Sequence, residues 1–69
     1  MITLEQVYET LDNAEVEYND VYDDIVDCCS DEDARKAYKA LTKAKVRCAI
    51  MRSEDEYTPD CVVLLDIKF

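Results

Sequence analysis

The spacing of apolar residues in the first part of the chain constrains its fold most strongly. These residues recur at alternating steps of three and four: Leu4, Val7, Leu11, Ala14, Tyr18, Val21, Ile25 and Cys28. This pattern is typical of a helix that packs along a neighbouring helix. Thr3 can cap the helix, and Gln6 three positions later completes a capping box. We therefore predict one long helix over about residues 4–28.

A second helix is predicted over about residues 31–52. Ser30 repeats the capping signal, and the carboxylates that follow it complement the positive end of a helix dipole. The apolar positions keep the same spacing with smaller side chains: Ala34, Ala37, Leu41, Ala44, Cys48 and Met51. Because only one or two residues separate the two segments, we expect an antiparallel hairpin of helices.

The last part of the chain is predicted to be a linker and a strand. Thr58, Pro59 and Asp60 end the second helix, so residues 53–60 form the linker. Residues 61–67 are apolar and β-branched, which favours a strand. Apart from the first few residues, no other segment suggests a strand, so this one would pair with a second copy or with a target sheet. The residues expected to make that contact are Val62, Val63, Leu64, Leu65 and Ile67.

Together these elements predict a single, mainly α domain over residues 1–69. It would be an antiparallel two-helix hairpin with a C-terminal β-strand, a small α+β unit completed by homodimerisation. A chain of 69 residues has a small core, which rarely supplies more than roughly 3 to 5 kcal/mol of stability. Support from a partner or a second copy is therefore expected.

Charge is divided into blocks along the chain. Residues 1–33 carry only acidic side chains, residues 34–53 carry only basic ones, and the tail is again acidic, for a net charge of -9. One interpretation is that the acidic helix pairs with the basic one, which would bring Glu15 near Lys45 and Asp24 near Arg35 or Lys36. The blocks would then have a purely internal role.

The alternative interpretation is that the acidic residues bind a partner. Six carboxylates would lie on the helix face turned away from the hairpin: Glu5, Glu9, Asp12, Asp20, Asp23 and Asp27. Their density along a helix approaches that of phosphates along a nucleic acid. Tyr8 and Tyr22 beside them are good contact residues, because aromatic side chains offer a large area and a polar tip.

The leading functional hypothesis is therefore an acidic inhibitor or sequestering factor. Its target would be a basic nucleic-acid-handling or defence protein, bound by nucleic-acid-like mimicry. In size, acidity and lack of glycine the chain resembles accessory proteins of phages and mobile elements, a resemblance without a motif. The rival is a structural module whose hairpin and strand build a homo-oligomer. Direct nucleic-acid binding is disfavoured because acid outweighs the short basic block.

Composition argues against several other classes of function. Without glycine or histidine, the chain has no glycine-rich phosphate loop, imidazole base or histidine metal ligand. Cys28 and Cys29 would lie far along the hairpin from Cys48, so we expect free thiols in a reducing cytoplasm and no metal or other cofactor. We expect no enzymatic activity, since two helices provide little interior for a catalytic pocket. No apolar run is long enough to span a membrane.

Overall fold

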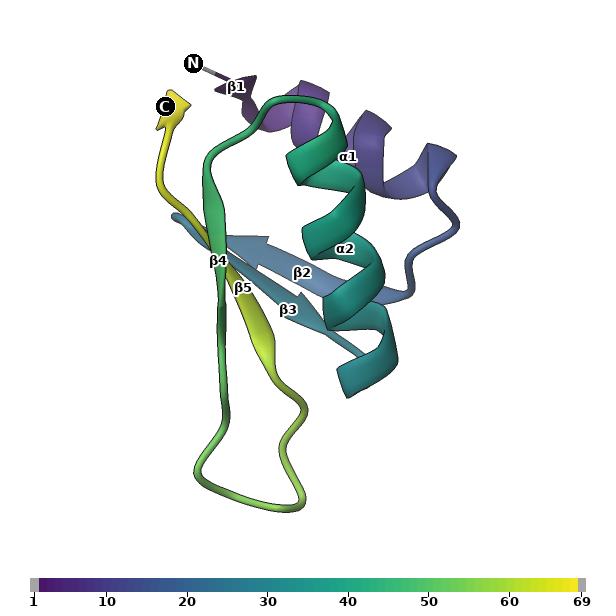
Figure 1. Ribbon diagram of the computed structural model, residues 1–69, viewed down its shortest axis with the longest axis vertical. Coiled ribbons are helices and arrows are strands. Elements are labelled where there is room, and N and C mark those ends of the chain that lie inside the picture. Colours follow the sequence, from purple (N-terminus) through teal and green to yellow (C-terminus); the bar gives the residue numbers. More distant parts are fainter. Residues whose placement is uncertain (1, 69) are drawn as a thin grey trace.

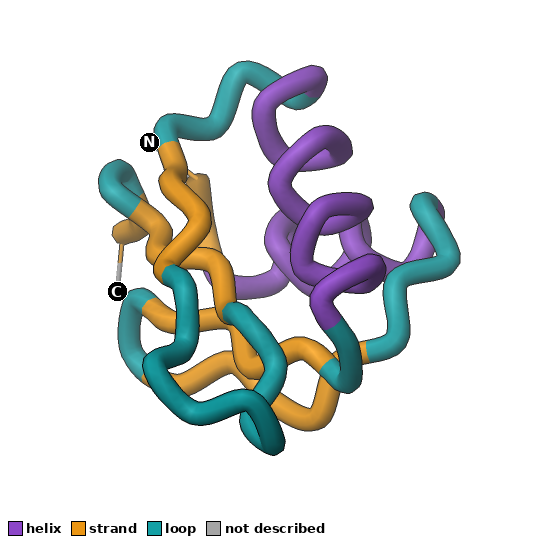
Figure 2. The backbone as a smooth tube through the Cα atoms, turned by 60° about the horizontal axis from the view of Figure 1, so that its bottom comes forward, coloured by secondary structure: helices purple, strands orange, loops and turns teal. Residues whose placement is uncertain are grey.

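The computed structural model describes residues 2–68, with the backbone alone for Lys68. The elements in chain order are β1 (Ile2–Thr3), α1 (Leu4–Asn13), β2 (Tyr18–Tyr22), β3 (Ile25–Cys28), α2 (Asp31–Lys43), β4 (Cys48–Met51), β5 (Cys61–Leu64) and β6 (Ile67–Lys68). Strands β2, β3, β5 and β4 form, in that order, an antiparallel sheet, and β1 pairs with β6 in parallel. Both helices lie on the same side of the sheet (Figures 1 and 2).

The predicted helical hairpin is wrong: the chain has a small α+β fold with a four-stranded antiparallel sheet. The first helix starts after Thr3 with the predicted capping box, but it ends at Asn13. The following residues form the β2–β3 hairpin, because aromatic and β-branched side chains favour strands and Asp-rich pairs favour turns. Asp23 in the turn of this hairpin has a φ of 48°. Asparagine and aspartate tolerate this left-handed backbone better than most residues.

The second helix also starts where predicted and ends early. The Ser30 hydroxyl accepts a hydrogen bond from the Asp33 backbone N–H at 3.1 Å, and the helix stops at Lys43. Residues 48–51, expected to be helical, form strand β4 instead. The predicted strand at Cys61 is present as β5, but it lies in the middle of the sheet, between β3 and β4. The unpaired ladder from which a strand-pairing dimer was predicted therefore does not exist.

The core lies between the helices and one face of the sheet. Leu11 of α1 and Leu41 of α2 are fully buried there, and β3 and β5 contribute Val26 and Val62. In β3 and β5 the buried residues alternate with more exposed ones, as side chains on opposite faces of a sheet do. The helices thus cover one face of the sheet and leave the other uncovered.

The chain is built from two similar αββ halves, α1–β2–β3 and α2–β4–β5. The residues at the end of the first helix recur at the end of the second, at positions 30 higher. The identical pairs are Leu11 and Leu41, Ala14 and Ala44, and Val16 and Val46. The backbone repeats as well, since Val16 N–H donates to the Leu11 carbonyl at 3.1 Å and Val46 N–H to the Leu41 carbonyl at 2.9 Å. The two halves join through β3 and β5, so β2 and β4 form the two edges of the sheet.

Candidate functional site

The six carboxylates predicted to form one helical ridge are divided between two layers of the molecule. Glu5, Glu9 and Asp12 are exposed on α1, as predicted for that part of the helix. Asp20 lies on β2, Asp23 in the next turn and Asp27 on β3. They do not form a continuous helical row, so the comparison with the phosphate spacing of a nucleic acid no longer applies to them.

The two tyrosines predicted to anchor a partner have different surroundings. Tyr8 is half-buried and stacks on Tyr18, with ring centroids 6.1 Å apart. The Tyr18 hydroxyl donates a hydrogen bond to the Asp12 carboxylate at 3.2 Å, and partial burial with this carboxylate raises the Tyr18 pKa. Tyr22, at the end of β2, is 56% exposed. Of the two predicted anchors, Tyr22 is the one available to a partner.

The uncovered face of the sheet carries an apolar row. Strand register aligns Tyr22 with Ile25, Ile25 with Val63, and Val63 with Ala49. The row therefore crosses all four strands, from one edge of the sheet to the other. Its members alternate along the strands with buried core residues such as Val21, Val26 and Val62, which places them on the face opposite the helices.

A second row on the same face combines acidic and apolar side chains. Asp20 pairs with Asp27, and Cys61 pairs with Met51. Asp27 and Cys61 are neighbours across β3 and β5. Burial raises the pKa of the Cys61 thiol, and the nearby carboxylate of Asp27 raises it further. Acid thus lies on the β2–β3 side of the row and apolar surface on the β5–β4 side.

Several side chains of this face remain exposed to a degree unusual for their size. Met51 is 48% exposed and Leu65, which follows β5, is 59% exposed. With Tyr22 they give the uncovered face three large apolar groups of high exposure. Leu65 was among the predicted contact residues, whereas Ile25, Ala49 and Met51 were missed. The pairing register of four strands, which the sequence does not display, brings these three into line with the others.

The remaining predicted contact residues are built into the fold. Val62 and Leu64 are buried core residues of β5, and Val63 belongs to the apolar row. Ile67 pairs with Ile2 across β6 and β1. Of the five predicted contact residues, Leu65 is exposed and Val63 lies on the uncovered face, whereas the other three pack in or against the core.

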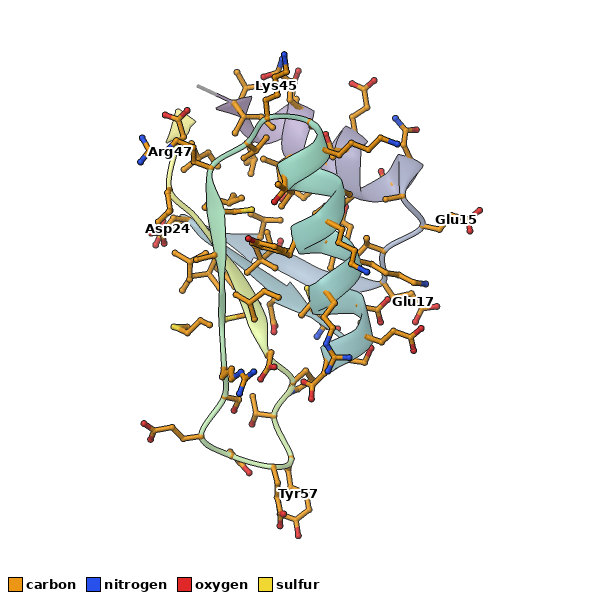
Figure 3. All side chains as sticks on the ribbon, viewed as in Figure 1. Glu15, Glu17, Asp24, Lys45, Arg47 and Tyr57 are labelled. Atoms are coloured by element: carbon orange, nitrogen blue, oxygen red, sulfur yellow. The ribbon has the colours of Figure 1, made fainter. Side chains whose placement is uncertain are left out.

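Within residues 2–68, no ion pair joins the acidic and basic residues that were expected to pair between the two helices. Glu15 follows α1 and Lys45 follows α2, and Figure 3 shows Lys45 at the top of the molecule and Glu15 on its right side, apart from one another. Asp24 lies beyond β2, on a different side from Glu15. Arg35, Lys36 and Lys39 are exposed on α2. Most charged side chains of the two blocks therefore face solvent, and Asp33 is the buried exception among the described residues.

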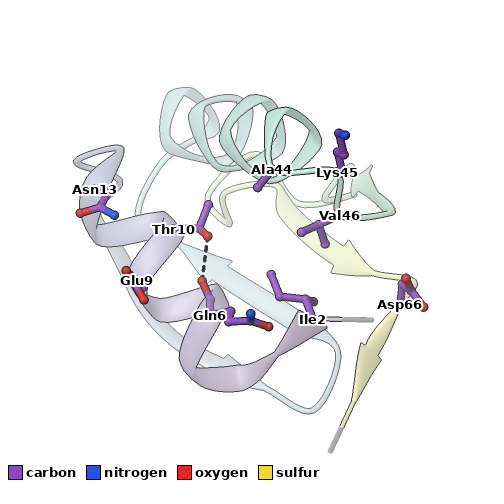
Figure 4. Close-up of a pocket in the computed structure, with 9 residues that line it drawn as sticks. All are labelled: Ile2, Gln6, Glu9, Thr10, Asn13, Ala44, Lys45, Val46 and Asp66. Atoms are coloured by element: carbon purple, nitrogen blue, oxygen red, sulfur yellow. Dashed lines mark hydrogen bonds between the residues drawn. The ribbon is translucent and has the colours of Figure 1, made fainter.

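A shallow hollow of about 290 Å³ lies where the C-terminal ends of the two helices approach the first and last strands. Figure 4 shows its lining: Ile2, Gln6, Glu9, Thr10, Asn13, Ala44, Lys45, Val46 and Asp66. The Thr10 hydroxyl donates a hydrogen bond to the Gln6 carbonyl at 2.7 Å. The hollow is at the small end of the range for ligand pockets and holds polar groups of both charges.

The four cysteines are free thiols in different surroundings. Cys28 is buried beneath the helices, and this burial raises its pKa to about 12. Burial also raises the pKa of Cys48, whereas Cys29 is exposed. Over the part of the chain that the structure describes, no three cysteine and acidic side chains gather as metal ligands would.

Comparisons of the chain with protein-family models, with curated proteins and with solved structures gave no match. Within residues 2–68, neither helix has the length and apolar character that crossing a membrane requires. The uncovered sheet face, with its apolar row and neighbouring carboxylates, is the candidate functional site of this protein.

Proposed function

We propose that this protein is a small acidic binding protein, without catalytic activity, that captures a basic protein on the uncovered face of its sheet. The observation that carries this proposal is the apolar row of Tyr22, Ile25, Val63 and Ala49 with Asp20 and Asp27 directly beside it. The exposed Met51 and Leu65 extend the apolar surface.

The composition of this face is that of a protein interface. Tyrosine and methionine are enriched at such interfaces because they combine large apolar area with adaptable or polar ends. Contiguous exposed apolar surface bordered by polar residues marks interaction sites on soluble proteins. Tyr22 and Met51 lie on the two edge strands, so a partner that covered both would span the whole sheet.

The negative charge of the uncovered face favours a partner with a positively charged surface. Asp20 and Asp27 are next to one another across β2 and β3, and like charges directly opposite are unfavourable in the free protein. A cationic side chain placed between them would relieve that repulsion. With a net charge of -9, the protein would also attract basic partners over a distance, which accelerates association.

Proteins that handle nucleic acids are partners of this kind, because they carry basic surfaces that bind phosphates. We propose such a protein as the target, and inhibition or sequestration as the result of binding. This target class agrees with the mimicry hypothesis, but the contact now centres on an apolar row with acid beside it. The proposed location is the cytoplasm, where the four free thiols would stay reduced.

The test is affinity capture with variants of the uncovered face. A tagged wild-type chain and the variant Tyr22→Lys/Met51→Lys are incubated with bacterial lysate, and retained proteins are identified by mass spectrometry. We expect the wild type to retain a basic protein that the face variant loses. Glu5→Gln/Glu9→Gln is the matched control, because it raises the net charge by the same amount on the exposed surface of α1. Loss of the same protein with the control, but not with the face variant, would refute the proposal.

A further inference from the structure

The two αββ halves carry opposite charges at equivalent exposed positions. The repeat of 30 residues aligns four carboxylates of the first half with four cations of the second: Glu5 with Arg35, Glu9 with Lys39, Glu15 with Lys45, and Glu17 with Arg47. All eight side chains are exposed. In Figure 3, Glu15 and Glu17 lie on one side of the molecule and Lys45 and Arg47 on another. Equivalent surfaces of the two αββ halves therefore carry opposite charges, with acidic side chains on the first half and basic side chains on the second.

This inversion of charge extends to the two edges of the sheet. The edge strand β2 is preceded by Glu17 and followed by Asp23, both exposed. The edge strand β4 is preceded by Arg47 and followed by Arg52, also both exposed. Each edge strand pairs on one side only within the described sheet. One edge strand therefore has an acidic residue at both ends, and the other has an arginine at both ends, with Arg52 lining a hollow together with Asp31 and Asp60.

We infer that a second copy of this chain is a partner of these edges, with β4 of one copy beside β2 of the next. Neighbouring strands of the sheet are antiparallel, so β2 and β4 run in opposite directions. A second copy in the same orientation then places its β2 antiparallel to β4. This pairing brings the Arg47 end of β4 beside the Asp23 end of β2 in the next copy, and the Arg52 end beside the Glu17 end.

Two copies of the same edge strand repel one another because their ends carry the same charge. Two β4 strands paired about a twofold axis would bring Arg47 against Arg52, and two β2 strands would bring Glu17 against Asp23. Charged edges are a common means of preventing sheets from joining. Here the charge prevents like edges from joining and favours unlike ones.

The contact is therefore between two different surfaces, and each bound copy still offers one free edge of each kind. Such an arrangement grows as an open chain unless its rotation closes a ring. The regular part of the acidic edge is short, since the pairing of β2 with β3 is irregular between Tyr18 and Asp20. A short edge strand with one or two charge pairs gives a weak, concentration-dependent contact. The net charge of -9 on every copy opposes growth further.

The experiment measures the mass of the whole chain by sedimentation velocity at rising concentrations, up to about 1 mM. The wild type is expected to show a weight-average mass that rises past that of a dimer without a plateau. Arg47→Glu/Arg52→Glu has two acidic edges and is expected to weaken association about tenfold or more. Glu17→Lys/Asp23→Lys has two basic edges and should lose association equally. An equimolar mixture of the two variants should restore it, because unlike edges are again available.

Lys36→Glu/Lys39→Glu is the matched control for net charge. It removes the same number of cations as Arg47→Glu/Arg52→Glu, but from the exposed surface of α2, and it should associate like the wild type. Circular dichroism verifies that each variant is folded. A wild type that stays monomeric, a mass that stops at a dimer, or equal loss in the control and the edge variants would each overturn the inference. Because Tyr22→Lys/Met51→Lys leaves all four edge charges in place, failure of partner capture can be distinguished from failure of self-association.

Discussion

At the scale of single residues, the buried Asp33 carboxylate links two segments of the chain through hydrogen bonds. One carboxylate oxygen accepts the Glu17 backbone N–H at 3.3 Å, and the other accepts the Ser30 hydroxyl at 2.8 Å. The hydrogen bond from Ser30 is the main cause that lowers the Asp33 pKa, followed by that from Glu17. Asp33 thus joins the first turn of α2 to the segment between α1 and β2.

We expect Asp33→Asn to destabilise the protein at neutral pH. A lowered pKa in the folded state means that the charged form favours folding. This contribution is present above the ordinary pKa of 3.8 and is lost as the pH falls through the lowered value. The thermal midpoint of the variant should therefore lie below that of the wild type at pH 7, and the difference should shrink in strong acid.

Glu32→Gln is the control for this residue. Glu32 is an exposed carboxylate in the same first turn of α2, so it shares the helix-dipole effect. If Glu32→Gln and Asp33→Asn lowered the midpoint equally at pH 7, the hydrogen bonds of Asp33 would have no stabilising role. A difference that persisted unchanged in acid would argue against the pKa as its source.

At the scale of elements, both helices end in the same strained turn. Glu15 and Lys45, one residue beyond the two C-caps, have φ values of 57° and 65°. Left-handed backbone costs a residue with a Cβ atom roughly 1 kcal/mol or more. Glycine usually occupies this position after a helix, yet the chain contains none.

We expect Glu15→Gly and Lys45→Gly each to raise the free energy of unfolding, by up to about 1 kcal/mol. Urea denaturation followed by circular dichroism measures the change. Lys39→Gly, in the middle of α2, should instead lower the free energy of unfolding by about 1 kcal/mol, because glycine is unfavourable inside helices. Destabilisation by all three substitutions would contradict the assigned turn geometry.

At the scale of the whole molecule, one small core holds both αββ halves together. Leu11 and Leu41 occupy equivalent positions in the two halves and are both fully buried. Truncating a buried leucine to alanine costs about 2 to 5 kcal/mol. That cost is comparable to the whole stability that a core of this size supplies, roughly 3 to 5 kcal/mol.

We therefore expect either Leu11→Ala or Leu41→Ala alone to abolish cooperative unfolding of the entire chain. Thermal melts by circular dichroism and the dispersion of amide NMR signals would report it. Lys39→Ala, on the exposed surface of α2, should leave the melt nearly unchanged. If one leucine variant kept a cooperative transition and the other did not, the two halves would be unequal partners in the core.

Local signals in the sequence predicted where both helices begin. Thr3 with Gln6, and Ser30 with its acidic neighbours, act on the backbone within a few residues. The same holds for the start of strand β5 at Cys61. These starts could be predicted because the stabilising groups lie beside one another in the chain.

The extent of each helix could not be predicted in this way. Val21, Ile25 and Cys28 continue a helical spacing by number, but Val21 and Cys28 reach the core from β2 and β3. Apolar residues at alternating steps of three and four positions are typical of a helix. The inward-facing residues of two short strands joined by a turn can show the same spacing. Strand β3 at Ile25–Cys28 pairs with β5, which lies more than 30 residues further along the chain, and β2 at Tyr18–Tyr22 joins the sheet through β3.

The starts of the helices, the acidic character and the opposite charges of the repeated segments are properties of neighbouring residues, so they can be recognised in the amino-acid order. The shared row of Tyr22, Ile25, Val63 and Ala49, and the position of β2 and β4 at the edges, result from the folded arrangement of the strands. Strand order and register arise from packing a single core against two helices. No local pattern encodes that packing, because its contacts join residues from opposite ends of the chain.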